Sequence, residues 1–113
     1  ENLVARAETI GATIGARLRA MRDDARFACI GDVRGLGAML AMELVKDRAT
    51  REPAPELAKS VVANSAARGL ILISCGVYSN VIRIMVPLTA STETVGEGLA
   101  ILESALADAL AAT

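Results

Sequence analysis

The chain has 113 residues and a formal net charge of −1, with 53% hydrophobic, 22% charged and 2% aromatic residues. This length suits one domain, the apolar content excludes a disordered chain, and the near-zero charge without a Lys/Arg cluster excludes a dedicated nucleic-acid binder. Because small aliphatic side chains must build the core, we expect less than the usual burial of roughly two-thirds of the unfolded surface. Apolar surface should then be left for a partner domain or subunit.

The numbers of cysteines and histidines indicate which metal sites and which cellular compartment are compatible with the chain. Cys29 and Cys75 do not form a Cys-x-x-Cys pair and the chain has no histidine, which argues against a zinc site. Free cysteines, no visible signal peptide and no run of about 20 apolar residues favour a cytoplasmic protein without a membrane span. The first residue is Glu1 rather than Met, so we expect a fragment or processed chain that begins inside a larger protein.

The first predicted element is an amphipathic helix over about residues 2–25. Its apolar stripe, with spacings of 7, 4, 4 and 3, consists of Leu3, Ile10, Ile14, Leu18 and Met21. Gly11 and Gly15 lie within this helix, where each costs about 1 kcal/mol relative to alanine. Packing must therefore hold the helix, and two glycines four residues apart permit the close approach of another backbone.

Two strands are expected next. Residues 28–33 are a short strand candidate, and residues 34–37, Arg-Gly-Leu-Gly, are expected to form a bend or bulge because glycine tolerates positive φ. Residues 38–45 are a stronger candidate for a strand. Residues 46–53 are polar and are predicted to be a loop.

A second and a third helix follow from their terminal residues and apolar spacing. Pro55 opens the second helix and Arg68-Gly69 closes it. Its expected buried side consists of Leu57, Val61, Val62 and Ala66. Ser91 or Thr89 caps the last helix, whose apolar stripe consists of Val95, Leu99, Leu102, Leu106 and Leu110.

Between these helices lie two more predicted strands. Residues 70–74 and 81–86 are apolar, residues 75–80 form the turn between them, and Pro87 ends the second strand. The resulting order is α-β-β-α-β-β-α. It predicts the α+β class, with a small, three- to four-stranded, mostly antiparallel sheet covered by helices on one face.

Arg83 interrupts the most apolar strand and is the leading candidate for a functional residue. In an extended strand Arg83 shares one face with Val81 and Met85, away from Ile82 and Ile84. One interpretation is a solvated sheet face, and another is an internal ion pair with Glu43. The functional hypothesis is that the open face lines a cleft in which the guanidinium, a permanent charge with a planar fork of donors, binds a carboxylate.

Other candidates have a simpler structural interpretation. The Gly35-x-Gly37 pair, without a following glycine pattern, indicates a link between strands rather than a phosphate loop. Lys46 and Lys59, the only lysines, are expected to be solvated, and Cys75 has no histidine to activate it. A basic streak on the first helix, interrupted by two aspartates, is expected to be a solvated face: Arg17, Arg19, Arg22 and Arg26. The residues alone therefore show no catalytic constellation and no metal site.

Two stretches carry a family resemblance. IGDVRGLGAMLAMELV (residues 30–45) and AARGLILISCGVYSNVIRIMVPLT (residues 66–89), followed by the closing amphipathic helix, resemble the C-terminal part of class III (ω-amino acid) aminotransferases. The first stretch fits a pattern general to the class. Residues 72–89 look more specific to the branch that acts on 4-aminobutyrate.

The resemblance implies a pyridoxal-phosphate enzyme with a large α/β domain and a small domain built from both chain ends. Residues 1–113 would be the C-terminal part of that small domain, in a homodimer or larger assembly that moves the amino group of 4-aminobutyrate to 2-oxoglutarate, giving succinate semialdehyde and glutamate. Arg83 matches the family arginine that receives a carboxylate of the 2-oxo acid or glutamate. With the ω-amino substrate bound, a glutamate of the large domain pairs with that arginine instead.

The resemblance also implies what this chain lacks. The lysine that forms the imine with the cofactor, the aspartate at its pyridinium nitrogen and the phosphate-binding loops belong to the large domain, and neither Lys46 nor Lys59 matches that lysine. We therefore expect no cofactor bound to this chain and no activity from it alone. Two alternatives stay open: a non-catalytic α+β module for binding a small acid or for assembly, and an aminotransferase for another ω-amino acid or acetylornithine.

Overall fold

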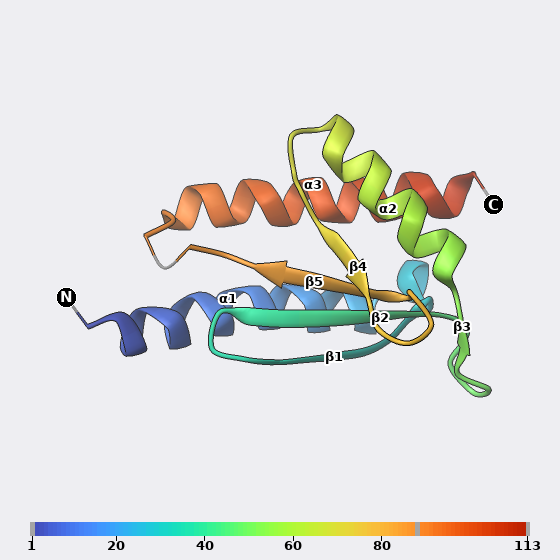
Figure 1. Cartoon of the computed structure of the whole chain (residues 1–113), viewed down its shortest axis with the longest axis horizontal. Helices are drawn as coiled ribbons and strands as arrows, with labels where there is room; N and C mark the ends of the chain where they lie inside the picture. The colour runs from blue at the N-terminus through green and yellow to red at the C-terminus, as the bar shows by residue number, and fades with distance from the viewer. Residues whose placement is uncertain (1, 88, 113) are drawn as a thin grey trace.

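A computed structural model describes residues 2–87 and 89–112 (Figure 1). The elements in chain order are α1 (Leu3–Asp23), the 3-10 turn η1 (Ala25–Phe27), β1 (Ile30–Leu36), β2 (Met39–Asp47), β3 (Glu52–Pro53), α2 (Pro55–Ala67), β4 (Ile73–Cys75), β5 (Val81–Met85) and α3 (Thr92–Ala111). This confirms the α+β class and the order of the seven expected elements. The additions are η1 and the two-residue strand β3.

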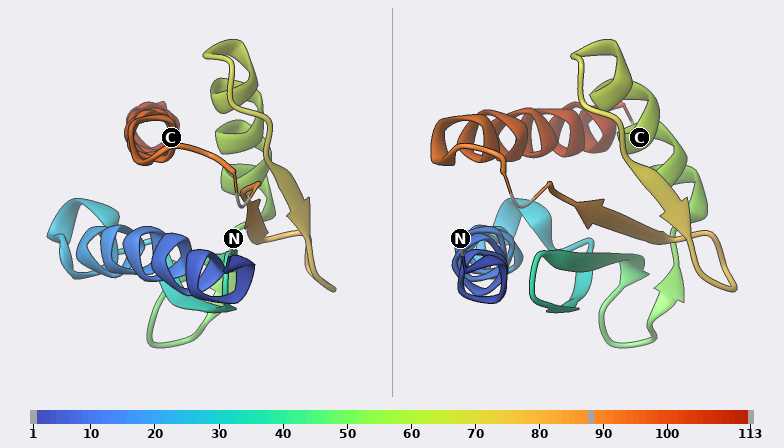
Figure 2. Two further views of the ribbon diagram at one scale, coloured as in Figure 1. Left: turned by 90° about the vertical axis from the view of Figure 1, so that its left-hand side faces the viewer. Right: turned by 60° about the vertical axis from the view of Figure 1, so that its left-hand side comes forward.

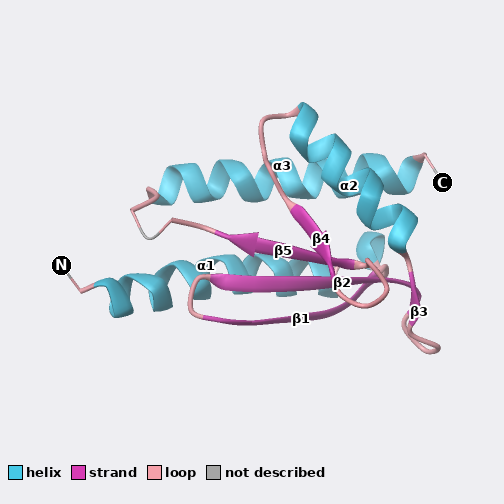
Figure 3. Cartoon of the chain, in the orientation of Figure 1, coloured by secondary structure: helices cyan, strands magenta, loops and turns pink. Residues whose placement is uncertain are grey.

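The sheet is antiparallel at every described pairing, with the strand order β1-β2-β5-β4 and β3 beside β2 (Figure 3). The helices α1 and α3 lie together on one side of it (Figure 2). Alternate residues of the central strands therefore meet different surroundings. Met42 of β2 and Ile82 of β5 are fully buried in the helix-covered core, whereas Met39 and Arg83 on the opposite face are exposed.

The turn between β1 and β2 is tighter than predicted. Residues 34–36 are not a bend, because Gly35 pairs with Leu40 and the hairpin continues to the pair of residues 36 and 39. Gly37, with φ +58°, begins the two-residue turn, as type I′ and II′ hairpins require. The ladder irregularity occurs earlier, at Gly31, between the pairs of Ile30 and Asp32.

Two other boundaries differ from the expected ones because non-local contacts decide them. The polar segment 46–53 contains β3, since Glu52 and Pro53 pair with the end of β2. The strand expected at residues 70–74 begins only at Ile73. The Leu70 amide donates to the Ser65 carbonyl at 2.8 Å and so belongs to the end of α2, next to Gly69 with φ +90°.

The helices bury the expected stripes except for Leu3 and Ala66, which are exposed, and Val62, which is half-buried. Ala58 and Ser65 are buried on α2 together with Leu57 and Val61. The last helix is capped by Ser91, whose Oγ accepts from the Thr94 amide at 3.1 Å, rather than by Thr89. The stripe of α3 is buried from Val95 to Leu106, and Leu110 is half-buried.

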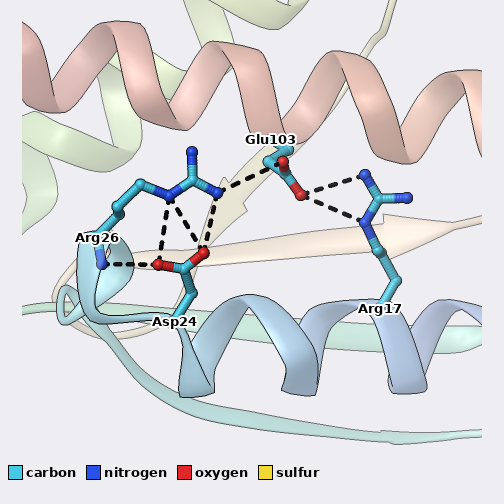
Figure 4. Close-up of polar contacts among 4 residues, drawn as sticks. All are labelled: Arg17, Asp24, Arg26 and Glu103. Carbon is cyan, nitrogen blue, oxygen red and sulfur yellow. Dashed lines mark hydrogen bonds and ion pairs between the residues drawn. The ribbon is translucent and has the colours of Figure 1, made fainter.

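Ion pairs join α1 to α3 at the edge of the core (Figure 4). Glu103 of α3 accepts from Nη2 of Arg17 at 3.1 Å and lies 3.8 Å from Nη2 of Arg26. Asp24 also accepts from Arg26. Two members of the predicted basic streak thus pair with carboxylates, and Arg19 and Arg22 are exposed.

The molecule exposes more surface than its mass requires. The accessible area is 6572 Å², whereas a compact monomer of 11.7 kDa exposes about 5,900 Å². Part of the excess is apolar, since several large side chains on the helix-free face and its neighbouring loops are exposed: Met39, Ile71, Ile73, Val77, Tyr78 and Met85. The expectation of incomplete burial is therefore met on a defined face.

Replacing Gly11 with alanine should destabilise the fold. A Cβ at this position would lie 1.9 Å from the Gly37 carbonyl oxygen, so α1 and the β1–β2 turn would have to separate. We expect the free energy of unfolding to fall by about 2 kcal/mol in urea denaturation followed by circular dichroism. The matched control is Gly96→Ala in α3, where a Cβ meets nothing within 4 Å and the helix should gain up to about 1 kcal/mol. Equal shifts for the two variants would contradict this packing.

Candidate functional site

The site is built around Arg83 in the middle of β5. The register places Ala41 of β2 on one side of Arg83 and Ile73 of β4 on the other. Its side chain is on the helix-free face, and it has no hydrogen bond or ion pair within residues 2–87 and 89–112. The prediction that Arg83 points away from the core is confirmed, and its donors are available to an external acceptor.

Apolar side chains surround this guanidinium on the same face. Ile73 is 57% exposed, Met85 60% and Met39 53%, and Ala41 is half-buried. Val81, which also belongs to this face, is buried beside the β4–β5 turn, where Gly76 approaches it. A covering element would remove this apolar surface from water and lower the dielectric around Arg83, which strengthens a contact with an anion.

The acids of this face are paired with another arginine. Nη1 of Arg34 on β1 donates to Oδ2 of Asp32 at 3.0 Å and to Oε2 of Glu43 at 3.2 Å. The hydrogen bond to Asp32, more than the one to Glu43, raises the pKa of Arg34. The structure therefore does not show the ion pair between Arg83 and Glu43 that we considered from the sequence.

Asn80 anchors the start of β5 and was not singled out from the sequence. It is buried, its Nδ2 donates to the Leu44 carbonyl at 2.9 Å, and its own carbonyl accepts from the Leu44 amide at 2.8 Å. These bonds fix the start of β5 against β2, three residues before Arg83. The only sequence indication was an amide at a turn-to-strand boundary, which does not reveal a buried partner.

An apolar groove of about 320 Å³ lies elsewhere on the chain. It is lined by the N-terminal half of α3, the end of β5 and the segment before β4, including Leu72, Ile84, Val95 and Leu99. Its volume is within the range of small-molecule pockets. However, none of its described lining residues is charged and Arg83 is not among them, so these residues offer no cation to a carboxylate.

Comparison with known proteins matches this chain to one family. The family model described as aminotransferase class-III matches residues 1–106. The 4-aminobutyrate aminotransferase of Mycobacterium leprae is 47% identical over 109 residues, which is 96% of this chain and 24% of that protein. The 5-aminovalerate aminotransferase of Pseudomonas putida is 44% identical over 108 residues, or 96% of this chain and 25% of that protein.

Solved structures agree with the family match. A structure described as a transaminase with L-Ala superposes with a TM-score of 0.86 at 28% identity, covering 98% of this chain and 26% of the other. A phospholyase from Arthrobacter in complex with phosphoethanolamine superposes with a TM-score of 0.85 at 30% identity, covering 95% and 25%. The chain thus spans about a quarter of the length of the relatives that it matches.

Pyridoxal phosphate, the cofactor of this family, does not fit the lysines of this chain. Lys46 is exposed and its Nζ lies 3.5 Å from Glu52, and Lys59 is exposed on α2. Lys46 borders a hollow formed with Val45, Ala54 and Leu57, but its ammonium group is directed to the Glu52 carboxylate. No group of three or more His, Cys, Asp or Glu side chains among the described residues could hold a metal ion. None of the helices in the described part of the chain combines the length and the apolar character that a membrane span requires.

Cys29 should be slow to react at neutral pH. Burial raises the pKa of its thiol to about 11, so the thiolate is scarce below that pH. In a Cys75→Ser variant, the rate of alkylation by iodoacetamide should rise about tenfold per pH unit between roughly pH 7 and 10 without levelling off. The same variant unfolded in urea is the control, with a plateau above about pH 9 as for an ordinary thiol. A plateau in the folded variant would contradict the burial of Cys29.

Proposed function

The chain belongs to the class III aminotransferases, and on that premise we propose that it is the C-terminal part of the small domain of an enzyme that transfers an amino group from 4-aminobutyrate to 2-oxoglutarate. Residues 1–113 supply Arg83 as the group that binds a substrate carboxylate. The cofactor lysine and the remaining walls of the site belong to the rest of the parent protein. The parent works as a homodimer or larger assembly in the cytoplasm.

The observation that carries this proposal is that Arg83, on an uncovered and largely apolar sheet face, has no hydrogen bond or ion pair with any residue that the structure describes. An arginine that had only a structural role would be expected to engage a nearby acid, as Arg34 does with Asp32 and Glu43. Arg83 has no such partner in the described part of the chain, and two parallel hydrogen bonds from a guanidinium match a carboxylate. The bare face around it supports a site completed by another part of the parent.

One guanidinium can serve both halves of the reaction. The 2-oxo acid carries a carboxylate next to its reacting carbon and a second one at the far end, and Arg83 binds one of them. 4-Aminobutyrate has only one carboxylate, distant from the amino group, so Arg83 would be left without an anion in that half. A glutamate from the large domain then pairs with Arg83 and offsets its charge, because an unpaired buried guanidinium costs several kcal/mol.

The amino donor can be one methylene longer. Relatives named for 4-aminobutyrate and for 5-aminovalerate match this chain at similar identity, 47% and 44%. Both donors are ω-amino acids with a single carboxylate, so the role of Arg83 is the same for each. One methylene in an apolar pocket discriminates by only about 1–3 kcal/mol, and the residues that do so belong to the rest of the parent.

Replacing Arg83 with alanine in the full-length parent should weaken the 2-oxo acid half-reaction selectively. We expect KM for 2-oxoglutarate to rise roughly tenfold to a hundredfold, the value of hydrogen bonds to a charged group, and the 4-aminobutyrate half-reaction to change far less. Single-turnover kinetics of each half-reaction measure the two effects. The control is Arg19→Ala, which removes an exposed arginine from α1, a helix on the face of the sheet opposite Arg83. It should change neither half-reaction. Equal losses of rate in the two half-reactions would contradict the proposal that Arg83 binds the substrate carboxylate.

The isolated chain should form no specific imine with pyridoxal phosphate. Lys46 and Lys59 are exposed in the fold, so their reactivity should match that in the unfolded chain. After borohydride reduction, mass spectrometry should find equal labelling of each lysine in the folded chain and in the chain unfolded by urea. Preferential labelling of one lysine, seen only in the folded state, would show a cofactor site that the geometry does not provide.

A further inference from the structure

Glu43, which lies on the same sheet face as Arg83, is the acid that could compete for its guanidinium. Ala41 pairs with Arg83 and Glu43 pairs with Val81, so Glu43 is the diagonal cross-strand neighbour of Arg83. Diagonal neighbours in an antiparallel pair are about 7–8 Å apart, within reach of two long side chains. A free Glu43 carboxylate could therefore bind the guanidinium of Arg83 and compete with any external carboxylate.

Arg34 binds Glu43 from β1, the strand that flanks β2 on the side away from β5. Its Nη1 lies 3.2 Å from Oε2 of Glu43 and 3.0 Å from Oδ2 of Asp32. Asp32 faces Glu43 in the β1–β2 register, so the two acids share one guanidinium and their mutual repulsion is relieved. The Glu43 carboxylate is thus held by a side chain of β1, and no ion pair joins it to Arg83 on β5.

From this arrangement we propose that Arg34 is a positioning residue which, by binding Glu43, keeps Arg83 free for the substrate carboxylate. This rests on the proposed function of Arg83. Arg34 does not touch the substrate in this role. Its effect is on an equilibrium: when Arg34 is lost, Glu43 turns to Arg83, and the substrate must displace an internal carboxylate before it binds.

The test uses full-length parent enzyme with Arg34→Gln. We expect KM for 2-oxoglutarate to rise on the order of fivefold, the factor that corresponds to an ion pair at the upper end of the exposed range. The 4-aminobutyrate half-reaction should change less than about twofold, since a freed Glu43 supplies the carboxylate that Arg83 needs in that half. Adding Glu43→Gln should restore KM for 2-oxoglutarate to near that of the unmodified enzyme.

The second substitution separates positioning from general damage to the fold. Both Arg34→Gln and the double variant lack the same ion pair, so a merely structural role would leave KM raised in both. Arg34→Lys, which keeps the positive charge but not the fork, covers the case in which Arg34→Gln does not fold. Its KM should rise about twofold and be restored by the same Glu43→Gln change.

The outcomes distinguish this inference from the proposed function. If Arg83→Ala raises KM for 2-oxoglutarate but neither Arg34 variant does, or if Glu43→Gln fails to restore it, the positioning role is overturned and the role of Arg83 stands. If Arg83→Ala itself leaves KM unchanged, the carboxylate role falls and the positioning role with it. A raised KM that Glu43→Gln reverses supports both.

Discussion

Helices cover one face of the sheet and leave the other bare, and this asymmetry decides what each residue of β5 does. Ile82 and Ile84 are buried under the helices, while Arg83 between them stands on the open face. Because side chains alternate along a strand, the apolar residues that hold β5 in the core also fix the direction of the guanidinium. The same five-residue strand therefore packs against the core and presents the guanidinium on the open face. Asn80 secures the start of this strand.

The two arginines of the open face, Arg34 and Arg83, differ in the partners that the structure gives them. Arg34 takes two carboxylates, from Asp32 and Glu43, although Arg83 lies only one strand away from Glu43. Exposed ion pairs contribute about 1 kcal/mol or less, so this distribution adds little to stability. Within residues 2–87 and 89–112, Arg34 is thus paired with two carboxylates, whereas Arg83 makes no hydrogen bond or ion pair.

Periodic patterns in the sequence predicted the parts of this fold that local physics controls. The stripes of α1 and α3 and the alternation in β5 follow from spacing alone, and so does the exposure of Arg83. Features that depend on distant backbone were missed. Gly35 is in a strand because Leu40 lies opposite. Arg48 is in a loop, as expected, but the hydrogen bond from its Nε to the Ile30 carbonyl at 2.9 Å was not foreseen. A pattern of residue types does not contain these partners.

Charge and enclosure, the two requirements for binding a small acid, are separated in this chain. Arg83 provides the charge on an open face, and the groove of about 320 Å³ provides enclosure, with no charged side chain among the described residues that line it. A millimolar dissociation constant corresponds to a favourable binding free energy of about 4 kcal/mol, whereas an exposed ion pair contributes about 1 kcal/mol or less. Under the proposed function, the difference comes from elements that cover Arg83, exclude water and lower the dielectric around it. The exposed side chains of Met39, Ile73 and Met85 are the apolar surface on which such elements would pack.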